Sequence, residues 1–500
     1  MTRRSLLYGS ALVAASAGLS ACSGGGGSAS GSGGAIAKGK GSARKPLSAP
    51  AHFSESPALA KQVKSGALPP VEKRLPKQPY VLPHNWVGRG NYGGRIYTSM
   101  FSSQGAAKAD SLRFFFYGHS PLRWLNDGLD IGPGHVQSWS SNSDASEWTF
   151  RLRDGIKWSD GHPFTTEDIL FWWEDIALPG NFAQVPADGF RSGTGTLCTM
   201  TAVDDRTLRL TYDTPVTLAA EWLALWPKGG VGTSGDIWVL PKHYCKQFHP
   251  KYNPSVPKDW DSVGGLWERK TDWMRNPECP TLLGYMCKSF DNNKGIVLER
   301  NPYYWCVTKD GDQLPYIDEI TVDIVQSPEV AKLQVQQGKI DYCHGPAVQI
   351  DLADVSTLQK SKDQAGTEIR LWDSGSGTGS MFFLNYDYPD EKYRTLFRDV
   401  RFRRALSYAF DRAAVHKSLY YQTGELTTGT VGPKCTEFHV GDGKGIYARW
   451  RDSYIKHDIG KAKQLLADLG LKDSDNDGYL EFPDGRKLTI YIDYSADIST

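Results

Sequence analysis

The sequence has no excess of one charge. After its first 22 residues it also has no long apolar run. Its 57 Lys and Arg side chains are almost balanced by 56 Asp and Glu side chains, which gives a formal net charge of +1. Proteins that bind nucleic acid need a basic surface to neutralise phosphates, so we expect no nucleic-acid partner. Beyond the first 22 residues, no apolar stretch reaches the roughly 20 residues that cross a hydrocarbon core. We therefore expect the remainder of the chain to be soluble and to lie outside the cytoplasm.

The motifs of common catalytic sites are also missing. The sequence has no Gly-x-Ser-x-Gly elbow, no His-Glu-x-x-His helix and no phosphate-cradling glycine loop. No two cysteines have CxxC spacing, which disfavours zinc and thioredoxin-like sites. We expect a protein that is not an enzyme and has no catalytic residues. A secreted glycosidase, with two carboxylates across an aromatic cleft, is the alternative from another class.

The first 22 residues have the pattern of an export signal. Paired Arg3 and Arg4 precede an apolar stretch of about 14 residues, which ends in the sequence Leu-Ser-Ala-Cys at Cys22. This order of basic, apolar and small residues is typical of a signal peptide. The Arg pair resembles a twin-arginine signal, and the last four residues resemble the lipobox of bacterial lipoproteins. We expect Cys22 to be acylated and to anchor the protein on the periplasmic or cell-surface side of the cytoplasmic membrane.

A flexible tether is expected after the anchor. The Gly/Ser run from 23 to 34 cannot build a core, and residues up to 83 are poor in apolar periodicity. We assign 1–22 to the signal peptide with its lipobox, and 23–83 to the tether and lead-in.

Seven cysteines remain when Cys22 is set aside. Disulfides are expected in an exported protein, and Cys279 and Cys287 are close enough in sequence to close a small loop. The odd number implies a free thiol or an absent partner, and the connectivity stays open.

The segment from Trp148 to Glu174 carries the most specific pattern. Apolar residues alternate from 148 to 152, which predicts a strand. Asp154-Gly155 and Ser159-Asp160-Gly161 predict two turns. Thr165 is the expected N-cap of a helix, with carboxylates in its first turn where they suit the helix dipole.

This strand, double turn and capped helix closely resembles the signature of the family 5 extracellular solute-binding proteins, which are receptors of ABC importers. Further segments are similar to the family's in the same order: Thr201–Leu210, Val239–His243, Val297–Trp305, Ala331–Asp341 and Phe397–Arg412. In the last of these, we expect Asp399 to cap a helix with an apolar stripe formed by Val400, Ala405, Leu406, Ala409 and Phe410. The resemblance extends from about Tyr92 to the end of the sequence.

The resemblance implies a mixed α/β, periplasmic-binding-protein-like fold. It has two lobes, an extra subdomain and a ligand cleft between the lobes. We assign lobe I to 92–307, with the subdomain at about 112–213, and lobe II to 316–500. A strand is expected over Lys487–Tyr494, and lobe II is expected to be incomplete because a C-terminal part is missing.

The implied function is that of the extracytoplasmic substrate-binding component of an ABC importer. A monomer would capture an oligopeptide or similar solute by closing its cleft, and would deliver it to a membrane permease driven by a separate ATPase. An oligosaccharide is the alternative ligand, for which aromatic platforms would dominate. The 16 Trp and 24 Tyr suit either such a pocket or large cores. Candidate ligand contacts at or just past strand ends are Tyr117, Trp372, Asp373 and Asn385.

The loop from Asp473 to Asp484 has the spacing of an EF-hand calcium loop. Carboxylates stand at its positions 1, 3 and 5, Gly478 at position 6, and acids at positions 9 and 12. The alternative is a solvated acidic hairpin loop, since the last acid is the shorter Asp and no helix follows Pro483. The implied function requires no cofactor. A structural calcium is the one candidate ion, with the ligands Asp473, Asp475, Asp477, Glu481 and Asp484.

Overall fold

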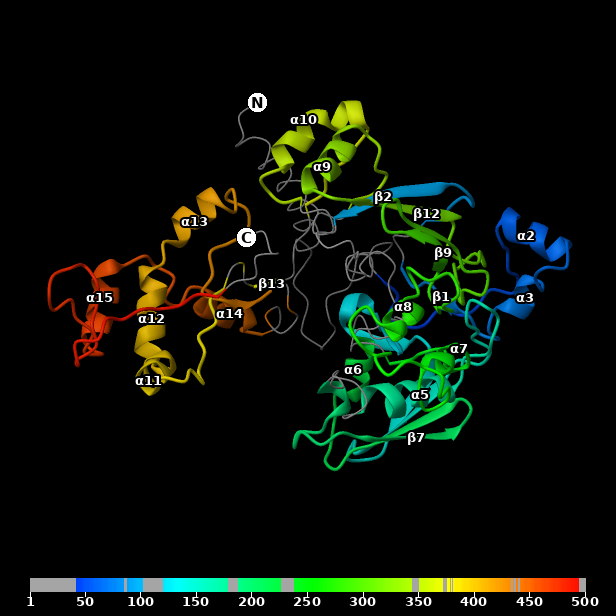
Figure 1. The fold of residues 1–500 in the computed structure, drawn as a ribbon, viewed down its shortest axis with the longest axis horizontal. Helices are drawn as coiled ribbons and strands as arrows, with labels where there is room; N and C mark the ends of the chain where they lie inside the picture. Colours follow the sequence, from blue (N-terminus) through cyan, green and yellow to red (C-terminus); the bar gives the residue numbers. More distant parts are fainter. Residues whose placement is uncertain are drawn as a thin grey trace. The chain divides into compact units, whose positions relative to one another are not determined.

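The structure is a computed structural model, and it describes twelve stretches of the chain. These are residues 42–84, 88–101, 120–178, 188–225, 238–343, 350–371, 376–377, 379, 381–432, 435, 438 and 441–493. They divide into two compact units, the first unit up to residue 348 and the second unit from residue 349 (Figure 1). Every helix within these stretches is too short or too polar to pass through a lipid bilayer.

The chain is already folded from residue 42 onward. It forms α2 (Pro57–Lys64), α3 (Val71–Arg74) and β1 (Tyr80–Val81), and β1 pairs in parallel with β11 (Cys306–Val307). Ser56 begins α2, because its hydroxyl accepts the Leu59 N–H at 3.2 Å and a proline follows at the first helical position. This segment was expected to be a lead-in up to residue 83. Its later part is instead packed on the first unit.

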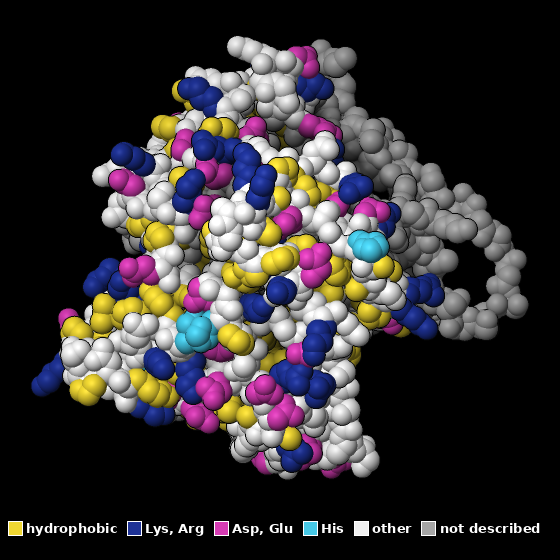
Figure 2. Space-filling model, turned by 90° about the vertical axis from the view of Figure 1, so that its right-hand side faces the viewer, with side chains coloured by type: hydrophobic (Ala, Val, Ile, Leu, Met, Phe, Trp, Pro, Cys, Tyr) yellow, Lys and Arg dark blue, Asp and Glu magenta, His cyan; other side chains and the backbone are white. Residues whose placement is uncertain are grey.

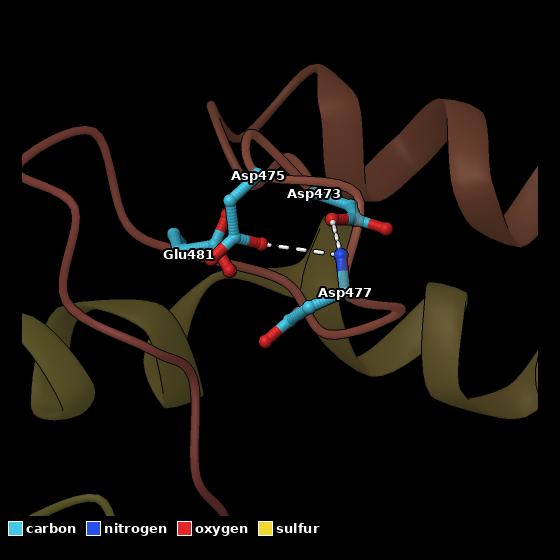
Figure 3. A group of neighbouring side chains, drawn as sticks. All are labelled: Asp473, Asp475, Asp477 and Glu481. Carbon is cyan, nitrogen blue, oxygen red and sulfur yellow. Dashed lines mark hydrogen bonds between the residues drawn. The ribbon is translucent and has the colours of Figure 1, made fainter.

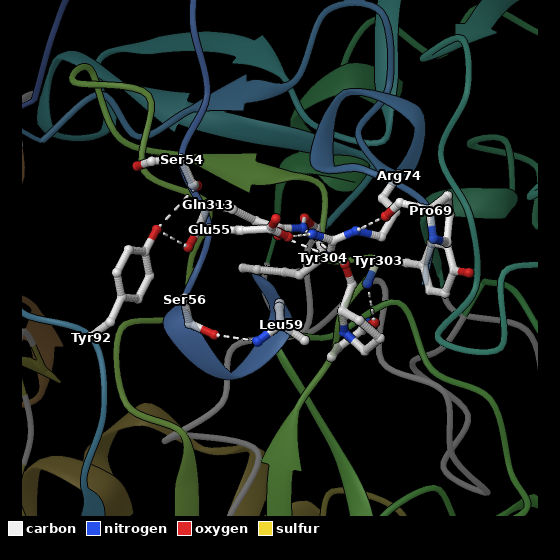
Figure 4. Close-up of polar contacts among 12 residues, drawn as sticks. Ser54, Glu55, Ser56, Leu59, Pro69, Arg74, Tyr92, Tyr303, Tyr304 and Gln313 are labelled. Atoms are coloured by element: carbon white, nitrogen blue, oxygen red, sulfur yellow. Dashed lines mark hydrogen bonds and ion pairs between the residues drawn. The ribbon is translucent and has the colours of Figure 1, made fainter. Parts of the chain in front are cut away.

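Arg74 holds this segment in place (Figure 4). Its side chain is fully buried, and its Nε donates to the Pro69 carbonyl at 3.0 Å. Its Nη1 donates to the Pro302 carbonyl and to Gln313 Oε1, the latter at 3.1 Å. Its Nη2 pairs with Glu55. A guanidinium can be buried when its donors are satisfied in this way.

The central sheet of the first unit joins strands that are far apart in sequence. Its order is β2-β12-β10-β9, formed by Arg95–Phe101, Glu319–Val325, Gly295–Arg300 and Tyr285–Asp291. The pair β2–β12 is parallel and the other two pairs are antiparallel. Helix α9 (Pro328–Gln336) follows, and Gly338 beyond its end has a positive φ of 66°. Because β12 and α9 belong to this unit, the division falls later than the lobe II start expected near Tyr316.

A second sheet confirms the strand and turns expected in the most specific segment. Its order is β5-β6-β8-β7, formed by Val136–Ser141, Glu147–Leu152, Thr207–Thr211 and Thr199–Asp204. In β6 the alternating residues Trp148, Phe150 and Leu152 are all buried. Gly155 and Gly161 have φ values of 91° and 87°, which glycine accepts without strain. A hairpin of β3 (Leu122–Leu125) and β4 (Asp130–Pro133) lies before this sheet in the sequence.

Helix α5 (Thr166–Phe171) begins with the expected cap. Thr165 accepts the Glu167 N–H, and Asp168 reaches back to the Thr165 N–H at 3.0 Å, which makes a reciprocal capping box. Asp168 is itself buried, and it also accepts from Trp158 Nε1 at 3.1 Å and from the Lys242 N–H at 2.9 Å. The helix continues as a π-helical turn, η2 (Trp172–Ala177).

Most tryptophans fill the core of the first unit. Trp158, Trp238 and Trp305 are among its largest fully buried side chains. The remaining elements around this core are short: η1 (Asn126–Gly128), η3 (Asp188–Phe190), α6 (Ala219–Ala224), α7 (Lys242–Cys245), η4 (Lys246–Phe248) and α8 (Leu266–Thr271). Cys279 and Cys287 are buried free thiols, so the small disulfide loop considered from the sequence is not formed. Burial raises the pKa of the Cys287 thiol to about 12.

The second unit is mainly helical. It contains α10 (Val355–Ala365), α11 (Glu391–Arg398), α12 (Val400–Ala409), α13 (Arg412–Ser418), α14 (Gly443–Arg451) and α15 (Ile459–Ala467), with the two-residue strands β13 (Ser376–Gly377) and β14 (Thr430–Val431). Its core cluster consists of Tyr393, Leu396, Phe397, Phe402, Leu471 and Phe482.

Two sequence-based expectations for the second unit need correction. Asp399 does cap α12, since it accepts the Arg401 N–H at 2.7 Å. Of the expected stripe, Ala405 is buried and Leu406 packs against the core cluster, whereas Val400, Ala409 and Phe410 are exposed. Phe402, which was not part of the expected stripe, is the other buried residue of α12. Residues 487–493 form no strand in the described part, and their one bridge joins Lys487 to Glu481.

The burial of Asp168 gives a stability prediction. Replacing it by Ala leaves three donors without their acceptor, so we expect Asp168→Ala to lower the free energy of unfolding by about 3 kcal/mol. The neighbouring Glu167 is the matched control, because its side chain is 71% exposed and pairs with Lys242 Nζ at the surface. Glu167→Ala should cost less than about 1 kcal/mol. Denaturant unfolding followed by Trp fluorescence measures both free energies of unfolding. Equal losses for the two variants would contradict the stabilising role of the buried Asp168 carboxylate.

Asp312 gives a pH-dependent prediction. Its carboxylate accepts from Arg89 Nε and Nη2 at 2.8 Å each, from the Ser54 hydroxyl at 2.6 Å and from the Tyr316 hydroxyl at 2.7 Å. The Arg89 contacts lead in lowering the pKa of Asp312 to about 2. The resulting stabilisation is complete above the unfolded pKa of about 3.9, and it is lost as the pH falls towards 2.

We therefore expect Asp312→Asn to lose about 2 kcal/mol at pH 7, and the difference from the unchanged chain to shrink as the pH falls from about 4 to 2. The exposed neighbour Asp310 serves as control in the form Asp310→Asn. Thermal unfolding at a series of pH values provides the measurement. A difference that does not change with pH would rule out the charge of Asp312 as its cause.

Candidate functional site

Of the four candidate ligand contacts, one lies in the described part of the chain. Tyr117, Trp372 and Asp373 lie outside the described residues. Asn385 is exposed, and its Oδ1 accepts the Asp387 N–H at 2.9 Å. Asn385 therefore supports the turn that leads into α11, and its contact with a ligand stays a prediction.

Three exposed apolar side chains precede Asn385 and were missed by the sequence reasoning. Met381, Phe382 and Phe383 are 50%, 65% and 84% exposed, and we call them the 381–383 segment. The Phe382 ring lies 6.4 Å from the Phe410 ring in an edge-to-face arrangement. Consecutive exposed aromatic rings on a folded unit are typical of a surface that another molecule covers. The run Met-Phe-Phe-Leu, followed directly by a turn, is the signal that could have identified them.

The acidic loop brings four of its five predicted ligands together (Figure 3). One carboxylate oxygen from each of Asp473, Asp475, Asp477 and Glu481 lies within 4.8 Å of the others. Asn476 and Gly478 have positive φ values of 60° and 90°, which bend the backbone around these carboxylates. The Gly478 N–H donates to Asp473 Oδ2 at 3.0 Å.

Glu481 differs from the three aspartates in its burial. The aspartates are exposed, whereas Glu481 is only 5% exposed. Its Oε2 accepts the Ser474 N–H at 2.7 Å, while its Oε1 is buried with no hydrogen-bond partner in the described part of the chain. Its backbone exchanges two hydrogen bonds with Lys472, which places the carboxylate at the base of the loop.

The fifth predicted ligand, Asp484, is not part of this group. Its carboxylate pairs with Lys392, which lowers the pKa of Asp484. The next turn of the hairpin places Lys487 against Asp477, and this ammonium lowers the pKa of Asp477. The acid at EF-hand position 9 thus joins the aspartates, and the acid at position 12 does not.

Positive and negative side chains are interspersed on the face drawn in Figure 2. This mixture agrees with the balanced composition of 57 basic and 56 acidic side chains. That face therefore has no broad basic surface of the kind that phosphates require.

Comparison with protein families gives one match that covers most of the chain. The model described as bacterial extracellular solute-binding proteins, family 5 middle, matches residues 130–499. The periplasmic alpha-galactoside-binding protein of Rhizobium meliloti is 28% identical over 88% of this chain and 63% of its own length. The periplasmic oligopeptide-binding protein OppA of Salmonella typhimurium is 25% identical over 68% of this chain and 54% of its own length.

Solved structures of the same kind are similar in fold. An oligopeptide-binding protein OppA superposes with a TM-score of 0.63 and 30% identity, over 87% of this chain and 66% of that chain. The periplasmic binding protein MelB of Agrobacterium fabrum, solved with stachyose, gives a TM-score of 0.62 and 23% identity, over 90% of this chain and 68% of that chain. These likenesses confirm the two-lobe α/β fold expected from the sequence. The chain spans about two thirds or less of the length of these relatives.

Proposed function

The chain belongs to family 5 of the bacterial extracellular solute-binding proteins, and on that premise we propose that it is the extracytoplasmic substrate-binding component of an ABC importer. The observation that carries this proposal is the family match over residues 130–499. The proteins that the chain resembles are solute-binding proteins, not enzymes. In the proposed mechanism, the protein captures a solute and passes it to a membrane permease, whose ATPase supplies the energy.

The solute that we propose is a neutral oligosaccharide. The relative that binds an alpha-galactoside aligns with 88% of this chain, and the curated OppA aligns with 68%. The exposed rings of Phe382 and Phe383 supply the flat apolar surfaces on which the C–H faces of a sugar can pack. Asn385 lies two residues beyond Phe383 and can offer an amide donor, since the turn uses its Oδ1 as acceptor and not its Nδ2.

An oligopeptide is the second candidate, and it was the first expectation from the sequence. It is supported by the 30% identity with an oligopeptide-binding OppA of known structure. The two solute classes make different demands. A peptide brings backbone N–H and C=O groups that must be paired, whereas a sugar brings hydroxyls around an apolar ring face.

The proposal includes the place where the protein works. The pattern of residues 1–22 supports export, with acylated Cys22 as the membrane anchor and the Gly/Ser run 23–34 as the tether. A lipid anchor keeps the binding protein close to its permease. The anchor thereby raises the effective concentration of the binding protein at the permease. Labelling with a radioactive fatty acid tests this step, and we expect Cys22→Ser to abolish the label.

We expect the chain to be stabilised by its solute. A ligand that binds only the folded state raises the unfolding midpoint, so thermal unfolding should be measured with stachyose and, separately, with a pool of tri- to pentapeptides. The proposal predicts a rise with stachyose or a related α-galactoside. A rise with peptides alone would move the assignment to the second candidate. A response to neither, repeated by calorimetry, would contradict solute binding by this chain.

The role of the 381–383 segment can be separated from that of the fold. Because Phe383 is 84% exposed, Phe383→Ala should leave the free energy of unfolding unchanged within about 0.5 kcal/mol. We expect it to weaken solute binding about tenfold, or 1.4 kcal/mol. Tyr479→Ala is the matched control, since this exposed aromatic lies elsewhere in the second unit. Equal affinities for all three proteins would exclude the segment from the binding surface.

A further inference from the structure

We propose that the loop from Asp473 to Glu481 binds a calcium ion, which fixes the hairpin that follows α15 onto the core of the second unit. The ligands from side chains are Asp473, Asp475, Asp477 and Glu481 (Figure 3). The loop shares no residue with the proposed solute surface, and calcium binding there does not depend on which solute is bound.

Glu481 is the observation that distinguishes this loop from an ordinary acidic surface. A carboxylate that is 5% exposed loses most of its hydration, and burial of a charge without a partner is unfavourable. Among the described residues, the Glu481 carboxylate accepts one hydrogen bond, from the Ser474 N–H to its Oε2, and its buried Oε1 has no partner there. The Glu481 carboxylate also lies beside the carboxylates of three aspartates, whose negative charges repel its own. A cation among the four would satisfy Oε1 and remove the repulsion.

The spread of the oxygens fits within the coordination shell of calcium. Oxygens on opposite sides of a Ca²⁺ ion, at 2.3–2.6 Å from it, lie about 5 Å apart. The four carboxylates of this loop offer oxygens within 4.8 Å of one another. Around Mg²⁺ the same separation is about 4 Å, and that ion demands a nearly ideal octahedron. Water and backbone carbonyls can supply the other oxygens of the six to eight that calcium takes.

The hydrogen bonds within the loop leave room for a cation. Asp473 accepts the N–H groups of Asp477 and Gly478, and Asp475 Oδ1 accepts the Asp477 N–H at 3.2 Å. Each ionised carboxylate has about four lone-pair sites, so one or two N–H contacts do not exhaust it. These contacts hold the aspartates in position before an ion arrives, which lowers the entropy lost on binding.

The basic side chains around the loop have other partners, with one exception. Lys392 pairs with Asp484, and Arg486 pairs with Asp390. Lys487 contacts Asp477 and is the only one of the three that faces a proposed ligand. Its side chain is 53% exposed and its ammonium can turn to solvent, so it weakens calcium binding without preventing it.

The position of the loop gives the ion a structural effect. Leu471 and Phe482, which flank the loop, are both buried in the core cluster of the second unit. Lys472 and Glu481 close the loop by exchanging N–H···O bonds of 3.2 Å and 2.8 Å. A metal that binds only the folded loop must therefore stabilise the packing of Leu471 and Phe482 against α11 and α12.

The test is calcium binding by the full chain after treatment with a chelator. We expect calorimetry to give one Ca²⁺ per chain with a Kd of at most about 1 mM, the range of extracellular calcium modules. Terbium is a second probe, because Tyr479 lies inside the loop and can sensitise its luminescence. Glu481→Gln should weaken both signals at least about tenfold, and Asp475→Asn should do the same. Asp475 is exposed, so the second variant keeps the test valid if the first one misfolds.

Asp484→Asn is the matched control, since it removes an acid from the same hairpin but outside the group of four. It should leave calcium affinity within about twofold. The absence of calcium heat and of terbium luminescence up to about 10 mM metal would overturn the proposal. Equal affinities for the unchanged chain, Glu481→Gln and Asp475→Asn would also overturn it, because the ion would then be held elsewhere.

Discussion

The parallel pairing of β2 with β12 is the contact on which the first unit depends. Seven residues of each strand are in register, from Arg95–Glu319 to Phe101–Val325, and they join parts of the chain that are more than 200 residues apart. A parallel pair cannot be joined by a tight turn and needs a longer crossover connection between its strands. The second sheet and its tryptophan-rich core fill that role. Arg74 and Asp312 then attach the segment from residue 42 onward to the same region.

The second unit relies on local interactions to a greater degree. Its helices begin at aspartates, as α12 does at Asp399, and its core is a small cluster of aromatic and aliphatic side chains. A small core contributes limited hydrophobic stabilisation. An ion that ties the hairpin 472–488 to this cluster would add stability where apolar burial is least. The exposed rings of the 381–383 segment lie in the same unit. We infer that this unit carries both the surface for a solute and the device that stiffens it.

Sequence reasoning predicted what local chemistry decides, and it missed what distant partners decide. The cap at Thr165, the alternation in β6 and the family were predicted because short-range patterns specify them. The fold of residues 42–83 could not be foreseen, since Arg74 is held by Pro302 and Gln313. Asp484 has the spacing of a calcium ligand but pairs with Lys392, 92 residues away. Three of the four candidate ligand contacts lie outside the described residues, and they stay predictions.

The central claim is that this chain binds a solute and releases it unchanged. Native mass spectrometry of the chain, incubated with stachyose and the peptide pool together, tests this claim most directly. We predict one adduct per chain with the mass of an intact oligosaccharide, and unaltered sugar in the supernatant. An adduct with the mass of a peptide would change the solute and keep the function. A chain without adducts, or a sugar that is cleaved during the incubation, would contradict the account.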